Sequence, residues 1–563
     1  MQNIQNWWTQ TTIRSDNIMY IFQQKLKTIK TDLKQWNKDT FGDIMQAKKE
    51  LEAKMANLQQ TFITEGPNEE RNAQELILQR QWEERLKQEE LLWRQKSRVQ
   101  WLKQGERNTS FFHKSTIQNR AFNRILSLKT ADGDQVFSRD HIGSELNSYF
   151  TSLLSEPLQD RSQAIKEILG VIPSLVTKDQ NALLLREFTE QEIEETIFSM
   201  ATNKAPRLDG FTVEFFKACW PIIKADLLIL VRNFHRTKKV LLAINATFLT
   251  LIPKSNQADS PDKFRPIALC NVLYKILSKL MADRLKSILP SIISQEKTDC
   301  VEGRHIMDSI ILTQEVLHSL KTNRSPGMLI HLDLSKAFDG INWQYMKAIL
   351  KAFEFSQLWT NWIMELVSGA FFSILLNGGP LQPFSHSRGI RQGDPLSPFL
   401  FIIMAEGLGR SLTKAKQQNQ LTGIKPVHRG PTITHQQFVD DTMLMGAPTV
   451  KEARTISKVL KTFSEASGME INLTKSKLFF FNTSILVQRN LSRILNIQNY
   501  SLPTKYLGIP LSEHTYRSSN WEGLLKKMRA RLSNWTHRAL NMASRLILIN
   551  SILQTICSWA LPQ

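Results

Sequence analysis

The sequence predicts an α+β fold in which an antiparallel sheet is backed by helices. Residues 328–332 form a short apolar run of the length that a buried strand has. Residues 437–445 place two short apolar runs on either side of two adjacent acids, a pattern typical of a tight hairpin. Apolar residues at helical spacing predict helices over 269–289 and 306–320. Because helices and strands are grouped rather than strictly alternating, α+β is favoured.

The first hundred residues are predicted to be mainly helical. Residues 17–102 contain two glycines and one proline, so we expect a long helical hairpin that turns at Gly66-Pro67. Residues 94–129 then carry nine Lys/Arg against one acid, with aromatic residues interleaved. This basic belt fits RNA, because cations follow a phosphate backbone while aromatic rings stack on bases. Its predicted RNA-binding residues are Arg94, Arg98, Lys103, Arg107 and Lys114; the alternative is a solvated helix face whose aromatics are core.

Candidate catalytic acids lie at the tip of the predicted hairpin and after the buried strand. Asp440 and Asp441 repel one another unless a cation lies between them. Asp333 follows the apolar run 328–332, and residues 334–339 are expected to open a helix. Oxygen ligands from two separate elements suit Mg²⁺, and a pair of such ions is the usual equipment of phosphoryl transfer. The alternatives are an acidic surface hairpin for 440–441 and a helix cap for Asp333.

A third motif lies between these acids, at residues 388–398. Asp394 followed by Pro395 predicts a helix start, with a capping carboxylate and then proline in the first helical position. Arg391, Gln392 and the amides near Gly393 could hold a phosphate or a template backbone. The alternative is an ordinary loop that leads into a core helix.

Together these motifs resemble the reverse transcriptases of non-LTR (LINE-type) retrotransposons, especially those common in plants. Residues 333–339, 391–398 and 438–441 lie in the order of palm motifs A, B and C. Residues 251–254 and 264–271 resemble the fingers of that family, 468–477 its motif D and 506–511 its primer grip. The resemblance implies a right-hand polymerase and four regions: a helical extension (1–130), fingers (131–325), palm (326–480), and primer grip with partial thumb (481–563).

The resemblance also implies a role for individual residues. Asp333, Asp440 and Asp441 would hold two Mg²⁺ ions, with Mn²⁺ as a substitute, and Asp440 would be the direct ligand of the pair at the tip. Lys475 would be a general acid; its alternative is an exposed lysine. Phe338 would exclude the 2′-hydroxyl of ribonucleotides; its alternative is a core residue. The implied nucleotide-binding residues are Lys254, Arg265, Phe338, Arg391, Gln392 and Gly393, and the implied primer grip is Tyr506, Leu507 and Gly508.

The chain departs from the family pattern at three places. Arg207-Leu208 stands where Gly-Pro is usual, Val439 where alanine is most common, and Gly340 where a basic or polar residue is more common. The three acids are intact. These features leave three readings: an RNA-directed DNA polymerase that copies its own transcript, a catalytically decayed RNA-binding remnant, and an intron-maturase-like splicing helper.

Composition and cysteine usage fit an intracellular protein that binds nucleic acid. The chain has 72 Lys+Arg against 52 Asp+Glu, a net charge of +20, which favours a phosphate polymer as partner. Its four cysteines lie far apart, so neither a zinc site nor a disulfide framework is expected. No apolar run reaches membrane-spanning length, and a location in the nucleus or cytoplasm is expected.

The expected partners are an RNA template, a DNA primer, deoxynucleoside triphosphates and the element's own transcript. Endonuclease and RNase H regions are absent, so we expect a piece of a longer reading frame or a truncated copy.

Overall fold

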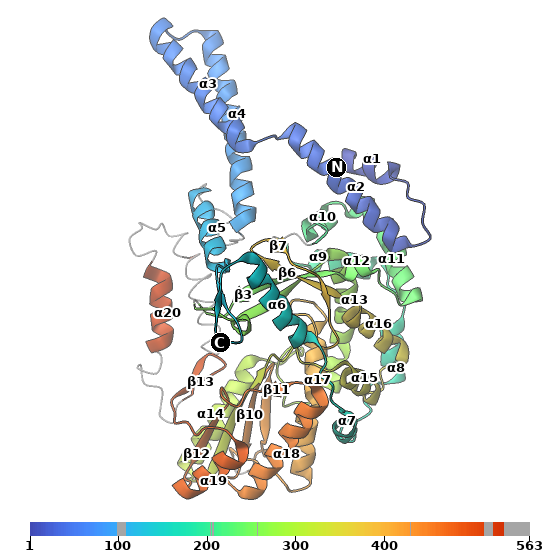
Figure 1. The fold of residues 1–563 in the computed structure, drawn as a ribbon, viewed down its shortest axis with the longest axis vertical. Coiled ribbons are helices and arrows are strands. Elements are labelled where there is room, and N and C mark those ends of the chain that lie inside the picture. Colours follow the sequence, from blue (N-terminus) through green and yellow to red (C-terminus); the bar gives the residue numbers. More distant parts are fainter. Residues whose placement is uncertain are drawn as a thin grey trace. The chain divides into compact units, whose positions relative to one another are not determined.

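The computed structural model describes residues 1–97, 109–202, 204, 208–255, 257–427, 429–511, 522–533 and 546 (Figure 1). The chain forms two compact units built from interleaved segments. Unit 1 contains residues 1–149, 187–277 and 369–385, and unit 2 contains 150–186, 278–368 and 386–563. The four consecutive regions predicted from the sequence do not coincide with these units, and they stay a prediction about function.

The helices of the first half of the chain are α1 (Gln2–Gln10), α2 (Ile18–Thr40), α3 (Ile44–Glu65), α4 (Glu69–Ser97), α5 (Thr109–Asn123), α6 (Arg139–Leu154), α7 (Ser162–Leu169), α8 (Lys178–Leu185), α9 (Glu190–Ser199), α10 (Val213–Ala218), α11 (Trp220–Thr237), α12 (Leu242–Asn245) and α13 (Val272–Ile292). Those of the second half are α14 (Ile306–Thr322), α15 (Trp343–Ala352), α16 (Gln357–Ser368), α17 (Ser397–Gln417), α18 (Val450–Ser467), α19 (Ile485–Leu495) and α20 (Glu522–Ser533).

An antiparallel sheet in unit 2 contains the predicted strand and the predicted hairpin. Its strands are β5 (Gly327–Ser335), β9 (His435–Phe438), β10 (Asp441–Gly446), β11 (Glu470–Ile471) and β12 (Lys477–Phe481). The strand order is β11-β5-β10-β9, and β12 also pairs with β5. Leu329 and Ile330 point to opposite faces of β5 and are both fully buried, so the sheet is covered on both sides. The predicted α+β class is confirmed, and this sheet, which contains the predicted motifs A and C, is called the palm sheet below.

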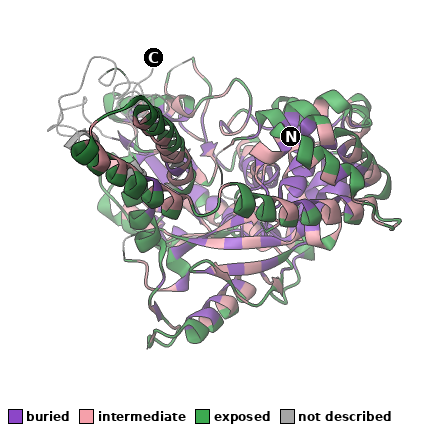
Figure 2. Ribbon diagram, turned by 90° about the horizontal axis from the view of Figure 1, so that it is seen from above, coloured by how far each residue is buried: buried purple, intermediate pink, exposed green. Residues whose placement is uncertain are grey.

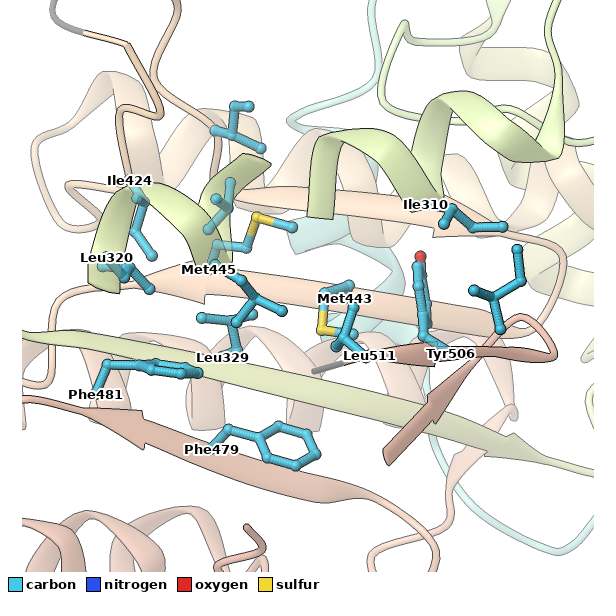
Figure 3. Close-up of a cluster of buried hydrophobic side chains, with 14 residues drawn as sticks. Ile310, Leu320, Leu329, Ile424, Met443, Met445, Phe479, Phe481, Tyr506 and Leu511 are labelled. Carbon is cyan, nitrogen blue, oxygen red and sulfur yellow. The ribbon is translucent and has the colours of Figure 1, made fainter. Parts of the chain in front are cut away.

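One face of this sheet carries a hydrophobic cluster (Figure 3). Leu329, Met443 and Phe479 reach it from three neighbouring strands. Side chains of α14 and of a small hairpin, β13 (Thr504–Tyr506) and β14 (Ile509–Leu511), close over them. The same hairpin carries the predicted primer-grip residues, so packing in this cluster attaches that hairpin to the palm sheet.

Unit 1 has its own five-stranded sheet. The strands are β3 (Thr247–Pro253), β4 (Phe264–Cys270), β6 (Phe371–Leu376), β7 (Gly379–Pro380) and β8 (Phe384–Ser385). A separate two-stranded ribbon is formed by β1 (Leu128–Lys129) and β2 (Gln135–Val136). The helix predicted from Leu269 onwards begins later, because Leu269 pairs with Phe248 in the β3–β4 ladder. The helix α13 then runs through Pro290 to Ile292 instead of ending before it.

The N-terminal helices contain the predicted turn at Gly66 and a second break, at Gly42, that was not predicted. Helices α3 and α4 form a hairpin that turns at Gly66, whose positive φ of 78° ends α3. A second break at Gly42 separates α2 from α3, and Asp43 caps α3 through the amides of Met45 and Gln46. The long hairpin predicted for 17–102 is therefore three helices over the described residues.

Figure 2 shows that buried residues follow the strands and one side of most helices, with exposed residues on the other.

No helix in the described part of the chain combines the length and the apolar character needed to cross a bilayer.

Two glycines allow the loop after β5 to touch the end of α18. A Cβ on Gly340 would lie 2.7 Å from the carbonyl oxygen of Gly468, and a Cβ on Gly468 would lie even closer to the carbonyl oxygen of Gly340. Gly468 also has φ +76° and terminates α18. The glycine at 340, a departure from the family pattern, is therefore required by this close backbone contact.

Gly468→Ala is expected to lower the free energy of unfolding by about 2–4 kcal/mol. The cost combines a left-handed backbone conformation with overpacking against Gly340. The measurement is chemical denaturation of the purified chain. Gly303→Ala is the matched control: Gly303 also has positive φ, but nothing lies within 4 Å of its added Cβ, so a loss of only about 1–2 kcal/mol is expected. Equal losses at both positions would contradict the role given to the close contact.

Candidate active site

The palm sheet brings the distant acids together. In the β5–β10 ladder, Asp441 is directly opposite Asp333. Directly opposed Cα atoms are about 4.5–5.5 Å apart and successive Cα atoms about 3.8 Å, so the Cα of Asp440 lies within about 10 Å of that of Asp333. The predicted convergence of acids separated by more than a hundred positions is confirmed. Their catalytic role stays a prediction.

The hairpin tip separates the two adjacent acids. Phe438 pairs with Asp441, so Val439 and Asp440 are the two turn residues. Val439 has φ +50°, a conformation that costs a β-branched residue on the order of 1–2 kcal/mol. Asp441 belongs to β10 and Asp440 to the turn, so the two carboxylates start from different backbone geometries. The sequence predicted both acids at the tip, but only Asp440 is a turn residue.

The backbone of Asp333 is fixed by the loop that carries Lys475. The Asp333 N–H donates to the hydroxyl of Ser476 (3.3 Å), and its carbonyl accepts from the N–H of Asn472 (2.8 Å). The Ser476 hydroxyl in turn donates to the Asn472 carbonyl at 2.8 Å. Lys475 lies in this loop with an exposed side chain. The structure therefore places Lys475 on a loop bonded directly to a predicted catalytic residue, and its role as general acid stays a prediction.

His331 belongs to the site, although sequence reasoning did not select it. Its Nε2 is 2.9 Å from Oδ1 of Asp441, diagonally across the β5–β10 ladder. The two side chains are 15% and 31% exposed. The alternation Leu329, His331, Asp333 was the available signal, because residues two apart in a strand face the same side.

The carboxylates at this site suit a divalent ion. Asp333 and Asp441 offer carboxylate oxygens on one face, and Asp440 offers another at the adjoining tip. Among the described residues the Asp333 carboxylate makes no hydrogen bond or ion pair, so its oxygens are open to a cation. No group of three or more His, Cys, Asp or Glu in the described ranges already has metal-site geometry. Hard oxygen donors with few protein ligands fit Mg²⁺ or Mn²⁺.

Motif A continues as a turn, not as the helix expected for 334–339. Strand β5 extends to Ser335, and Lys336 then takes φ +49°, which no helix accommodates. Phe338 stacks on Phe401 of α17, with ring centroids 5.0 Å apart, and is half-buried. The Phe338 ring therefore packs against the core on one side and is partly exposed to solvent. Its contact with a nucleotide sugar stays a prediction.

In motif B, Gln392 makes a polar contact with motif A, and Arg391 is packed in the core. The Gln392 amide donates to both carboxylate oxygens of the buried Asp339, at 3.1 and 3.2 Å. Arg391 is buried and donates to the Leu366 carbonyl at 3.1 Å. One guanidinium nitrogen therefore bonds to the fold, and the predicted contact of Arg391 with nucleotide or template stays a prediction. Gly393 is exposed with φ +101°.

The helix expected to begin at Pro395, with Asp394 as its cap, begins two residues later, at Ser397. The Asp394 carboxylate accepts from the hydroxyl of Ser278 at 2.6 Å and from that of Ser397 at 3.2 Å. The carboxylate therefore stays near the helix start but is bound to α13, and Pro398 rather than Pro395 lies in the first turn.

The predicted triphosphate clamp belongs to unit 1. Lys254 and Arg265 lie near the ends of paired strands β3 and β4, and both are exposed. The Lys254 ammonium donates to the Asp262 carbonyl at 2.6 Å. Both residues are thus neighbours on one strand pair.

Three of the five predicted RNA-binding residues of the basic belt lie outside the described residues. This holds for Arg98, Lys103 and Arg107, and nothing is described of the Arg94 side chain. Lys114 is exposed on α5. The belt stays a prediction. Arg207 of the family departure also lies outside the described residues.

The predicted primer grip is a tight hairpin. Leu507 and Gly508 form its turn with φ +47° and +87°, the pattern of a type I′ turn. Tyr506 is 1% exposed, and burial raises the pKa of its hydroxyl. Its ring lies edge-on to that of His331, with centroids 5.6 Å apart. Tyr506 is therefore an anchor in the core, and only Leu507 and Gly508 at the turn remain candidates for contact with a primer.

A buried network of charged side chains lies next to strand β9, the first strand of the hairpin that carries Asp440. Glu406 of α17 is fully buried and accepts from Arg410 (2.9 Å) and Ser294 (2.9 Å), while the Lys297 ammonium lies 3.3 Å away. Burial lowers the pKa of Lys297 to about 8 even though Glu406 opposes this. Burial would raise the pKa of Glu406, but its two cationic neighbours hold it below its ordinary value.

The network reaches the β9–β10 hairpin, which carries Asp440, through backbone contacts. The Gln437 N–H of β9 donates to the Glu296 carbonyl at 2.8 Å, and Lys297 forms a β-bridge with Gln437. Gln437 lies three residues before Asp440. No local sequence pattern indicates this network, because Ser294 and Lys297 are more than a hundred positions from Glu406.

Comparison with known proteins agrees with the motifs. Residues 252–511 match the family model described as reverse transcriptase (RNA-dependent DNA polymerase). The chain is 27% identical over 464 residues to an uncharacterized 149 kDa protein of transposon TX1 from Xenopus laevis, covering 81% of this chain and 35% of that protein. It is 27% identical over 294 residues to a retrovirus-related Pol polyprotein from the type-2 retrotransposable element R2DM of Drosophila melanogaster, covering 51% and 26%.

A shorter match and a solved structure complete the comparison. A segment of 72 residues is 43% identical to an uncharacterized mitochondrial protein of Arabidopsis thaliana, covering 13% of this chain and 59% of that protein. A telomerase from Candida albicans, solved in complex with a fragment of telomeric RNA, overlaps 58% of this chain and 59% of its own at a TM-score of 0.34 and 11% identity. That similarity is too weak to bear on the fold.

The chain spans about a third or less of the length of the TX1 and R2DM proteins. The family match nevertheless includes the strands and loops that carry motifs A, B, C and D and the primer-grip hairpin. Over residues 252–511 this chain therefore carries a reverse-transcriptase domain, of the LINE (non-LTR retrotransposon) type that its motifs predicted.

Proposed function

We propose that the chain is an RNA-directed DNA polymerase of a LINE-type element, which extends a DNA primer on an RNA template with deoxynucleoside triphosphates. The observation that carries this proposal is the pairing of Asp333 with Asp441, with Asp440 at the adjoining tip, inside the matched domain. The test is primer extension on an RNA template with Mg²⁺, using the purified chain and an Asp440→Ala control. Extension by the chain and none by the control is expected; equal extension by both would overturn the proposal.

Divalent ions are general to the reverse-transcriptase family, and here Asp333 and Asp440 would hold two of them, with Asp441 assisting. When bound, Mg²⁺ or Mn²⁺ lowers the pKa of the primer 3′-hydroxyl and neutralises charge on the triphosphate. Lys475 donates a proton to the departing pyrophosphate. Lys254 and Arg265 bind the triphosphate, the arginine through two parallel donors. Gln392, oriented by Asp339, contacts the nascent base pair.

Phe338 is proposed to select deoxynucleotides. Phe338→Val is expected to raise the use of ribonucleotides by about tenfold or more, because a shorter side chain leaves room for a 2′-hydroxyl. The measurement is the ratio of kcat/KM for a ribonucleotide and for its deoxynucleotide in single-nucleotide extension. Phe401→Leu is the matched control, since it removes the stacking partner of Phe338 without shortening Phe338. An unchanged ratio in Phe338→Val would refute the selection role.

The template is proposed to lie along the basic belt, in a ribonucleoprotein with the element's own transcript. A net charge of +20 supports a polyanionic partner. Neutralising Arg98, Lys103 and Arg107 together should reduce the slope of log affinity against log salt by about two to three; an unchanged slope in a filter-binding titration would contradict the assignment.

We further propose that the protein is located in the nucleus or cytoplasm, which the free Cys219, Cys270 and Cys300 support.

A decayed, RNA-binding remnant is the second candidate. The positive φ of Val439 at the catalytic tip favours it, because this departure imposes strain where geometry matters most. The two candidates differ in one measurement: a remnant would bind RNA but would incorporate no more nucleotide than Asp440→Ala.

A further inference from the structure

The carboxylate of Asp441 is held by a histidine from the neighbouring strand. His331 precedes Asp333 by two residues on β5, so both side chains leave the same face of the sheet as Asp441. Directly across the ladder, His331 is paired with Met443 and Asp333 with Asp441. The contact of 2.9 Å between His331 Nε2 and Asp441 Oδ1 is therefore diagonal, and it draws the Asp441 carboxylate toward residue 331.

This contact addresses a problem that the sheet register creates. Like charges directly opposite one another in an antiparallel pair are destabilising. Asp333 and Asp441 occupy such positions. A hydrogen bond from His331 satisfies one Asp441 oxygen, and the carboxylate of Asp333 is not used in this contact.

The histidine ring is itself held in place. Tyr506 of β13 packs edge-on against it, with an interplanar angle of 89°. Tyr506 is fixed by the hydrophobic cluster that joins β13 to the palm sheet (Figure 3). His331 is only 15% exposed. A ring confined by an aromatic neighbour and by low exposure has few other orientations, so the direction of its Nε2 is set by the fold.

We propose that His331 is a positioning residue for the divalent-ion site and acts through Asp441. It fixes one assisting carboxylate, so that the oxygens of Asp333 and Asp440 meet an ion in a preset arrangement. Hydrogen bonds of this kind to ligating groups typically change ion affinity by about 10–100-fold. The inference rests on the proposed function, because it assigns a role within the same site.

The test measures Mn²⁺ binding directly, by the electron paramagnetic resonance signal of free Mn²⁺, on the full chain without nucleic acid or nucleotide. His331→Ala is expected to weaken binding about tenfold. His331→Gln is expected to bind Mn²⁺ within about threefold of the unchanged chain, because its amide nitrogen can donate where Nε2 does. Met443→Leu, a volume-conserving change directly opposite His331, is the control for disturbance of the sheet.

A double-mutant cycle shows whether His331 acts through Asp441. If it does, His331→Ala added to Asp441→Asn weakens Mn²⁺ binding no further than Asp441→Asn alone. Losses that multiply would overturn the proposal, as would unchanged binding in His331→Ala or an equal loss in Met443→Leu. Should His331→Ala fail to fold, His331→Asn replaces it, because its shorter amide stops before the Asp441 carboxylate.

Primer extension separates this inference from the proposed function. The Mg²⁺ concentration for half-maximal extension is expected to rise about tenfold in His331→Ala and to stay near that of the unchanged chain in His331→Gln. If the unchanged chain binds Mn²⁺ in a His331-dependent way but extends no primer, the proposed function fails and the role of His331 stands. If the unchanged chain binds no Mn²⁺ at millimolar concentration, the role of His331 fails.

Discussion

Replacing Asp333 with asparagine is expected to reduce nucleotide incorporation by about a thousandfold or more. Loss of a carboxylate that holds the ions removes several kcal/mol of transition-state stabilisation, and each 1.4 kcal/mol is a factor of about ten. The fold should survive, because Ser476 and Asn472 bind only the backbone of Asp333. Removing one of two opposed like charges should even stabilise the sheet slightly.

The measurement is single-nucleotide incorporation on an RNA template, with thermal unfolding of the same preparation. Asp283→Asn is the control, since Asp283 is a surface carboxylate that pairs with Lys279 one helical turn away. The control should keep normal incorporation. Incorporation by Asp333→Asn at more than about a tenth of the normal rate would exclude Asp333 from the reaction.

Glu406→Gln is expected to lower the free energy of unfolding at pH 7 by about 3–5 kcal/mol. The change leaves the fully buried Lys297 without its carboxylate, and an uncompensated buried charge is costly. Because Lys297 and the Glu296 carbonyl adjoin β9, activity should fall together with stability. Denaturant unfolding measures the loss.

The pH dependence of this loss gives a sharper check. The folded-state pKa of Glu406 lies below its ordinary value of 4.5, so its contribution is present above about pH 4.5 and is lost as the pH falls through the folded-state pKa. The difference between Glu406→Gln and the unchanged chain should therefore shrink in acid. A difference that stays constant from pH 7 to the acid limit of folding would show that lost packing, not charge, causes the effect. Lys263→Gln, which removes an exposed ion pair with Asp259, is the control and should leave stability nearly unchanged, because solvent screens exposed pairs.

Short patterns predicted the elements that carry the candidate site. The apolar run before Asp333 and the paired apolar runs around Asp440 were sufficient, because strand alternation and turn chemistry are local. Helix α14 and the turn at Gly66 followed from the same kind of evidence. These predictions did not depend on any partner element.

The errors occurred where a distant partner decides the local structure. Leu269 has helical spacing but pairs in a strand with Phe248. Asp394 has the chemistry of a helix cap but is bound to Ser278, 116 positions away. The contact of His331 with Asp441, and that of Lys297 with Glu406, arise from strand register and helix packing that no short window contains.

The interleaved arrangement of the two units sets the order in which the chain can fold during its synthesis. Strand β3 pairs in parallel with β6, and more than a hundred residues separate them. The sheet of unit 1 therefore cannot close until residues 371–385 have left the ribosome, by which time β5, the strand that carries Asp333, has already emerged. Long-range pairing of this kind is slow and exposes unpaired strand edges. Nascent chains that stall before residue 371 would thus present an open sheet edge to the cell's chaperones.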